Sequence, residues 1–146
     1  MNLEVEKNEF VNFDLSNWPL IVAKFEKLTN INDFITFLQK WENLRVYGQK
    51  YVIILDARNI KNVANYKCVM LASKFVKRLK KQNPQYLENS FLIYNTKVIL
   101  HLFRIIKTVQ KPISPTYLYY TKEKGDLNYL NLFQTKDEND NIKLFE

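Results

Sequence analysis

The sequence predicts an α/β fold: a single-domain sandwich with a mixed β-sheet and about four helices. Short apolar runs, which are typical of buried strands, alternate along the chain with amphipathic segments, which are typical of helices. The 146 residues are 47% hydrophobic and 14% aromatic, which is enough for one hydrophobic core. No repeat, low-complexity tract or linker divides the chain, so we expect one domain.

The first third is expected to form a β-hairpin followed by a helix. Strands are predicted over 10–15 and 20–27, with a turn containing Asn and Pro between them. A helix is predicted over 31–44, because apolar residues recur there at helical spacing after Asn30, a residue type that caps helices. Gly48 marks the end of this helical segment.

The middle of the chain is expected to form two buried strands and two helices. The runs 51–55 and 91–94 are short, continuous and apolar, as in strands covered on both faces. Helices are predicted over about 66–82 and 97–110, each with an apolar and a basic face. The expected core includes Phe34, Trp41, Ile53, Phe75, Leu79, Leu102 and Ile106. The inward face of the helix over 97–110 is expected to carry Val98, Ile99, Leu102, Ile105, Ile106 and Val109.

The last part is expected to finish the fold and end in a tail. A strand is predicted over 116–120 and a short helix over 125–133, with Leu127, Leu130 and Phe133 facing inward. Residues 134–146 are polar and acidic, so we expect them to form a loose tail outside the domain of residues 1–133.

The charge is strongly segregated along the chain. The formal net charge is +7, but residues 58–124 alone carry fourteen basic and two acidic side chains. Such a positive field attracts nucleic acid, anionic lipid or an acidic protein. A compositional explanation also stands, because lysines outnumber arginines eighteen to four, the bias expected of an AT-rich genome.

Several function classes are disfavoured. Phosphate-binding and dinucleotide-binding loops need clustered glycines, and this chain has two. One cysteine and one histidine leave no pattern for a zinc site, and neither HExxH nor GxSxG occurs. We therefore expect no enzyme activity, no catalytic residues, no metal and no cofactor. No apolar run approaches ~18 residues, and the first ten residues do not resemble a signal peptide, so a cytoplasmic protein is expected.

Three single residues have chemistry that could be catalytic. Asp56 ends a central strand, where a carboxylate could act as a base or a metal ligand; we favour a hydrogen bond to the following loop. His101 is placed on the outer face of its helix, without a carboxylate to orient it. Cys68 is placed on a buried helix face and is interpreted as core packing.

The order of elements resembles that of a known family. A hairpin, a helix, the strand Val52-Ile53-Ile54-Leu55-Asp56, a helix, the strand 91–94, a helix and the Pro-flanked strand 116–120 resemble the STAS domain over residues 8–133. That family includes bacterial anti-sigma-factor antagonists, and the resemblance implies a non-catalytic regulatory module. A weaker resemblance to the CRAL-TRIO lipid-transfer domain implies instead a small apolar ligand.

The STAS resemblance also implies a regulatory loop after the strand that ends in Asp56. Phospho-regulated members carry a serine or threonine at the start of the next helix, whereas this loop offers Asn59, Asn62 and Asn65. Asparagine can cap a helix but cannot accept a phosphoryl group. A phosphorylation switch is therefore not expected at this strand-end loop, while a binding role for its surface stays open.

The basic faces of the two central helices are the candidate binding surface. Apolar residues lie toward these faces among the cations, a mixture that favours contact with a partner over simple solvation. The proposed surface consists of Met70, Lys74, Lys77, Arg78, Leu100, Arg104 and Lys107. A protein partner or a second copy of the chain is the first hypothesis. Anionic lipid, nonspecifically bound nucleic acid and a small apolar ligand are the alternatives. Sequence-specific nucleic-acid recognition is disfavoured, because it depends on arginines and exposed aromatic side chains, whereas these faces carry mostly lysine and most aromatics fall on core faces.

Overall fold

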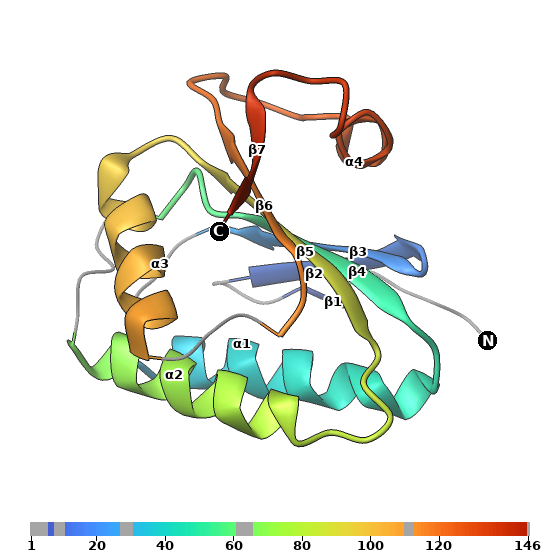
Figure 1. Cartoon of the computed structure of the whole chain (residues 1–146), viewed down its shortest axis with the longest axis vertical. Coiled ribbons are helices and arrows are strands. Elements are labelled where there is room, and N and C mark those ends of the chain that lie inside the picture. The colour runs from blue at the N-terminus through green and yellow to red at the C-terminus, as the bar shows by residue number, and fades with distance from the viewer. Residues whose placement is uncertain (1–5, 8–10, 27–30, 61–65, 110–112, 146) are drawn as a thin grey trace.

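A seven-stranded mixed sheet forms the centre of the protein, which is a single α/β domain (Figure 1). The structure is a computed structural model and describes residues 6–7, 11–26, 31–60, 66–109 and 113–145. The strands follow one another across the sheet in chain order. They are β1 (Glu6–Lys7), β2 (Val11–Asn17), β3 (Leu20–Phe25), β4 (Tyr51–Asp56), β5 (Leu87–Tyr94), β6 (Thr116–Tyr120) and β7 (Ile142–Phe145).

Strands β3, β4, β5 and β6 are parallel to one another, whereas the pairs β1–β2, β2–β3 and β6–β7 at the two sides of the sheet are antiparallel. Each parallel connection contains one helix: α1 (Ile31–Glu42), α2 (Tyr66–Lys80) and α3 (Lys97–Val109). Because every crossover moves in the same direction along the sheet, right-handed connections place all three helices on one face. The 3-10 helix η1 (Asn43–Tyr47) continues α1, and Gly48 ends it with a left-handed φ of 63°.

The larger part of the core lies between this face and the three helices. On β4, Ile53 points to the helical face while its neighbour Ile54 points to the other, and both are fully buried. Burial on both faces explains the continuous apolar run from Tyr51 to Leu55. Trp41 of α1 packs against Phe75 of α2, with ring centroids 4.9 Å apart.

The short helix α4 (Tyr129–Gln134) covers the opposite face of the sheet, as Figure 1 shows. Tyr129, Leu132 and Phe133 pack there against a smaller apolar cluster built around Phe91 and Ile93. Asn128 caps α4 by accepting a hydrogen bond from the backbone N–H of Asn131 at 3.0 Å.

The elements predicted from the sequence are confirmed with shifted boundaries. The hairpin, all three long helices and the strands at 51–55, 91–94 and 116–120 are present, and β4 and β5 are neighbours in one sheet. Strand β5 begins four residues earlier than predicted, at Leu87. The C-terminal helix is shorter than the predicted 125–133. The Asn30 cap lies outside the described residues.

The expectation of a loose tail over 134–146 is wrong for its last part. Residues Ile142–Phe145 form β7, which pairs with β6, and Ile142 is buried in the smaller cluster. The strand was missed because it has four residues, of which Ile142 alone is buried, and because acidic and polar residues precede it, so it gives little sequence signal.

Several burial predictions hold and others fail. Trp41, Ile53, Phe75 and Leu79 are buried as predicted. The side chains of Phe34, Leu102 and Ile106 are only partly buried, although they pack on the main core or line a pocket beneath it. Val98 and Ile105, predicted to face inward, are 48% and 51% exposed, and Leu130 of α4 is 40% exposed.

Candidate docking face and apolar pocket

Asp56 ends β4 in a buried ion pair. Its carboxylate accepts two hydrogen bonds from the Arg58 guanidinium, at 2.9 and 2.8 Å, and one from the hydroxyl of Tyr129 at 2.6 Å. The Asp56 and Arg58 side chains are 2% and 7% exposed. Arg58 also donates to the backbone oxygen of Glu123 at 2.9 Å. The network therefore joins the end of β4 to α4 and to the chain leading from β6.

The electrostatics of this network favour an ionised carboxylate. Burial raises the pKa of Asp56, but the hydrogen bonds from Arg58 and Tyr129 and the positive charge of Arg58 outweigh burial, so the net shift lowers it. Burial, and then the hydrogen bond to Asp56, raise the pKa of Tyr129 well above its usual range. A carboxylate held in this way is a structural anchor, in agreement with the favoured prediction that Asp56 hydrogen-bonds the following loop.

His101 and Cys68, the other two residues with chemistry that could be catalytic, lie where the sequence predicted, one at the surface and one in the core. His101 is exposed on α3. Cys68 is buried on α2, and burial raises the pKa of its thiol, which disfavours the reactive thiolate. In the strand-end loop, Asn59 is exposed, whereas Asn62 and Asn65 lie outside the described residues.

Helices α2 and α3 form the most basic part of the described surface. The two helices contain no Asp or Glu, and together they carry eight Lys or Arg residues. They pack against each other in the helical layer, as Figure 1 shows. Exposed cations on α2 include Lys67, Lys74, Lys77 and Arg78. Helix α1, by contrast, has two acidic residues and one basic residue.

Exposed apolar side chains accompany these cations. Met70 of α2 is 38% exposed, and Val98 and Ile105 of α3 are about half exposed. Val98 and Ile105 are seven residues apart, so they lie on the same side of α3. The residues that precede them, Lys97 and Arg104, are also exposed but point about 100° away from them. The exposed apolar side chains of α3 are therefore different from the one predicted, Leu100.

The structure keeps most, but not all, of the predicted binding surface on the outside. Met70, Lys74, Lys77, Arg78 and Arg104 are exposed. Two predicted members are partly buried: Leu100 packs on the main core, and Lys107 lies with its ammonium 4.3 Å from the centre of the Phe145 ring. Arg78 forms an ion pair with Glu42 of α1 at 2.9 Å.

An open hollow of about 570 Å³ lies where α3 meets β6 and β7. Three cationic side chains line it, from Lys97, Arg104 and Lys143, together with one carboxylate, that of Asp140. The aromatic rings of Tyr94 and Tyr120, 5.5 Å apart, form part of its wall. The hollow extends the positive surface of α3 onto the edge of the sheet.

An apolar pocket lies beneath α2 and α3. A hollow of about 160 Å³ is lined entirely by carbon-rich side chains of β3 to β5, the three long helices and the loop after β4, among them Phe37, Ala72 and Ile99. A second hollow of about 70 Å³ shares seven of these walls and continues to the start of β6. The shared residues are Trp41, Leu55, Phe75, Val76, Leu92, Phe103 and Ile106.

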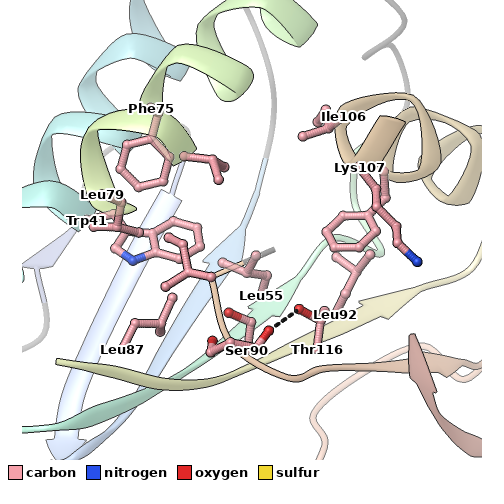
Figure 2. Close-up of a pocket in the computed structure, with 14 residues that line it drawn as sticks. Trp41, Leu55, Phe75, Leu79, Leu87, Ser90, Leu92, Ile106, Lys107 and Thr116 are labelled. Atoms are coloured by element: carbon pink, nitrogen blue, oxygen red, sulfur yellow. Dashed lines mark hydrogen bonds between the residues drawn. The ribbon is translucent and has the colours of Figure 1, made fainter. Parts of the chain in front are cut away.

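The smaller hollow has a polar end. Figure 2 shows Trp41 and Phe75 on one side, Ile106 and Lys107 on the other, and Ser90 and Thr116 at the floor. In Figure 2 the Lys107 nitrogen points away from Trp41 and Phe75. It lies 4.3 Å from the centre of the Phe145 ring. The hydroxyl of Ser114 is buried and has no hydrogen-bond partner among the described residues.

Sequence reasoning missed both the ion pair and the pocket. The spacing Asp56-Ala57-Arg58 was a usable signal, because an arginine two residues after a strand-end carboxylate can fold back on it. No comparable signal predicted the pocket, because the residues that line it have the same apolar pattern in the sequence as ordinary core residues.

Comparisons with known proteins leave the family of this chain open. No protein-family model matches the sequence, and no curated protein or solved structure is significantly similar to it. The resemblance to STAS and CRAL-TRIO domains therefore stays a prediction. Within the described ranges, no cluster of three or more His, Cys, Asp or Glu side chains could hold a metal ion, and no helix is long and apolar enough to cross a membrane.

Proposed function

We propose that the protein is a non-catalytic docking module that binds an acidic protein partner through the exposed sides of α2 and α3. The observation that carries the proposal is the composition of these helices: together they contain eight Lys or Arg residues and no carboxylate, and Met70, Val98 and Ile105 are also exposed on them. We call this surface the α2–α3 face.

Charge complementarity favours an acidic partner. Lys74 and Lys77 are exposed on α2, a helix that contains no Asp or Glu. The hollow lined by Lys97, Arg104 and Lys143, with Asp140 as the one carboxylate among its described lining residues, offers an acidic partner a concave site with an excess of positive charge. Such complementary fields speed association and discriminate against basic partners.

The exposed apolar side chains favour a protein over a polyanion. Phosphate backbones need only point charges, and lysines supply them without help from aliphatic groups. Protein interfaces, in contrast, gain most of their affinity from a few buried apolar or aromatic groups surrounded by a polar rim. Met70 and Ile105 fit the first role, and the cations around them fit the second.

The test compares capture of partners by the wild-type protein and by surface variants. Met70→Asp and Ile105→Asp remove apolar contact, Lys74→Glu with Lys77→Glu reverses charge, and Lys50→Glu is the matched control at an exposed lysine of the sheet layer. A protein captured by the wild type is identified, purified and titrated against each variant by calorimetry. We expect both variant classes to weaken its binding at least tenfold, and Lys50→Glu to leave it unchanged.

The salt dependence separates this proposal from its alternatives. A protein partner held by apolar burial keeps binding in moderate salt, because screening acts on the charged contacts alone. A duplex DNA oligonucleotide and vesicles containing phosphatidylserine serve as polyanionic probes. The proposal is wrong, and the face binds polyanions, if three results are obtained together: the probes bind, their affinity falls steeply with salt, and Met70→Asp and Ile105→Asp do not change that affinity. A purified chain that dimerises through this face would likewise replace the acidic partner with a second copy.

A further inference from the structure

We propose that the pocket beneath α2 and α3 is a binding site for a small, uncharged, largely apolar molecule with one hydrogen-bonding group at its end. The site lies between these helices and the sheet, and its walls, apart from Lys107, are not residues of the α2–α3 face. The proposal therefore stands independently of the docking function.

The size of the pocket fits a ligand of about six to eight carbon atoms. Protein cores rarely contain voids larger than a water molecule, whereas the larger hollow here measures about 160 Å³. An apolar cavity of about 150 Å³ is large enough to bind benzene. The adjoining hollow of about 70 Å³ leaves room for a few more atoms beyond that six-carbon body.

The lining selects an apolar ligand. Every side chain around the larger hollow is aliphatic or aromatic, apart from the thiol of Cys68. Water gains few hydrogen bonds in such a space, so an apolar molecule is favoured there over solvent. Trp41, Phe75 and Phe103 supply flat walls shared by the two hollows, which suits either a ring or an extended alkyl chain.

The polar end of the pocket selects one uncharged hydrogen-bonding group. Ser90, Ser114 and Thr116 line the smaller hollow, and the Thr116 hydroxyl already donates to the backbone oxygen of Ser114 at 3.3 Å. The Ser114 hydroxyl has no partner in the described part of the chain, although it is buried, and a buried hydroxyl without a hydrogen bond is costly. A ligand hydroxyl or carbonyl placed here would satisfy it.

A charged head group fits this end poorly. Among the described residues that line the smaller hollow, the cation is Lys107, and its ammonium lies over the Phe145 ring. In Figure 2 it points away from Trp41 and Phe75. Burying an ionised carboxylate among hydroxyl groups alone carries a large desolvation penalty. An alcohol should therefore bind better than the carboxylate of the same chain length.

Tryptophan fluorescence provides a direct assay. The chain has two tryptophans, and Trp41 lines both hollows. In a Trp18→Phe background, Trp41 reports on the pocket alone. The probes are the linear alcohols from 1-butanol to 1-decanol, with octanoate as the charged counterpart of 1-octanol. We expect a saturable change in emission, with affinity rising about fourfold for each added methylene until the pocket is full near eight carbons.

Filling the pocket is the decisive control. Ala72→Phe and Val76→Phe place a ring in the pocket from α2, and Lys74→Phe places the same ring on the exposed side of that helix. We expect at least one of the two filling variants to fold, as judged by circular dichroism, and to bind 1-octanol at least tenfold more weakly than the Lys74→Phe control. Ser114→Ala should weaken 1-octanol about two- to tenfold and leave benzene unaffected.

Three results would overturn the proposal. The first is a response that never saturates for any alcohol. The second is undiminished binding in a folded filling variant. The third concerns the polar end: octanoate binding more tightly than 1-octanol, or equal loss of benzene and 1-octanol in Ser114→Ala, would show that the pocket does not select an uncharged hydrogen-bonding group.

Discussion

Replacing Arg58 with methionine should destabilise the protein far more than the same change at Arg78. Both arginines form ion pairs with a carboxylate at 2.8–2.9 Å, but Arg58 is buried, binds Asp56 through two nitrogens and also donates to the backbone oxygen of Glu123. The Arg58 and Asp56 side chains are 7% and 2% exposed, whereas those of Arg78 and Glu42 are 52% and 28% exposed. The pairs thus have similar distances and different solvent environments.

The magnitudes follow from what each substitution leaves behind. Arg58→Met leaves the Asp56 carboxylate buried with a single strong donor, Tyr129, and breaking a buried pair in this way typically costs about 3–5 kcal/mol. Arg78→Met leaves Glu42 close to water, and exposed pairs contribute about 0–1 kcal/mol. The free energy of unfolding is measured by urea denaturation at pH 7.

The pH dependence gives a second readout. In the wild type the pKa of Asp56 lies below its ordinary value of 3.8, so the stability from its ionised form is present above that value and is lost as the pH falls through the lowered pKa. In Arg58→Met, burial dominates and raises this pKa, so the variant loses stability as the pH rises above the ordinary value. The gap between the two proteins should therefore be widest near pH 7 and shrink toward pH 3. A gap no larger than that of Arg78→Met, or one that does not change with pH, would refute the reasoning.

Further predictions concern the core and the last strand. Phe75→Ala should cost about 3–5 kcal/mol, because its ring is 2% exposed between Trp41 and the sheet; a loss under ~1 kcal/mol in a denaturant melt would contradict that placement. Ile99→Ala should cost about 2–5 kcal/mol whereas Ile105→Ala should change stability by less than about 1, and a reversed order would mean that α3 is rotated. Ile142→Ala should likewise destabilise the protein by about 2–5 kcal/mol, because β7 is paired with β6 and Ile142 is buried. In the wild type, the amide protons of β7 that are hydrogen-bonded to β6 should be protected from hydrogen exchange.

The sequence alone determined the order and type of the main elements. Period-2 and continuous apolar runs differ from the 3.6-residue helical period, and that difference is written locally in each segment. For this reason β4, β5 and β6 and the three long helices could be predicted within a few residues. The burial of Trp41, Phe75 and Leu79 followed equally well, because each lies in the middle of its helix's apolar stripe.

The rotation of α3 was decided by the tertiary structure. Its apolar side chains occupy well over half of the helix circumference at ~100° per residue, so the sequence did not decide which edge of this wide apolar arc is left exposed. Contact with the sheet and α2 buries Ile99 and leaves Val98 and Ile105 at the surface. The two apolar residues that most support the docking proposal could not therefore be found from periodicity.

The candidate site depended on long-range packing still more strongly. The pairing of Asp56 with Tyr129 joins residues 73 positions apart, and the pocket brings the end of α3 next to Trp41 of α1 and Ser114 before β6. Local sequence pattern specifies which side chains avoid water; it does not specify how completely they fill the space between helices and sheet. The sequence thus determined the elements and the positive charge of α2 and α3, while the packing of those elements decided where the ion pair, the exposed apolar groups and the pocket lie.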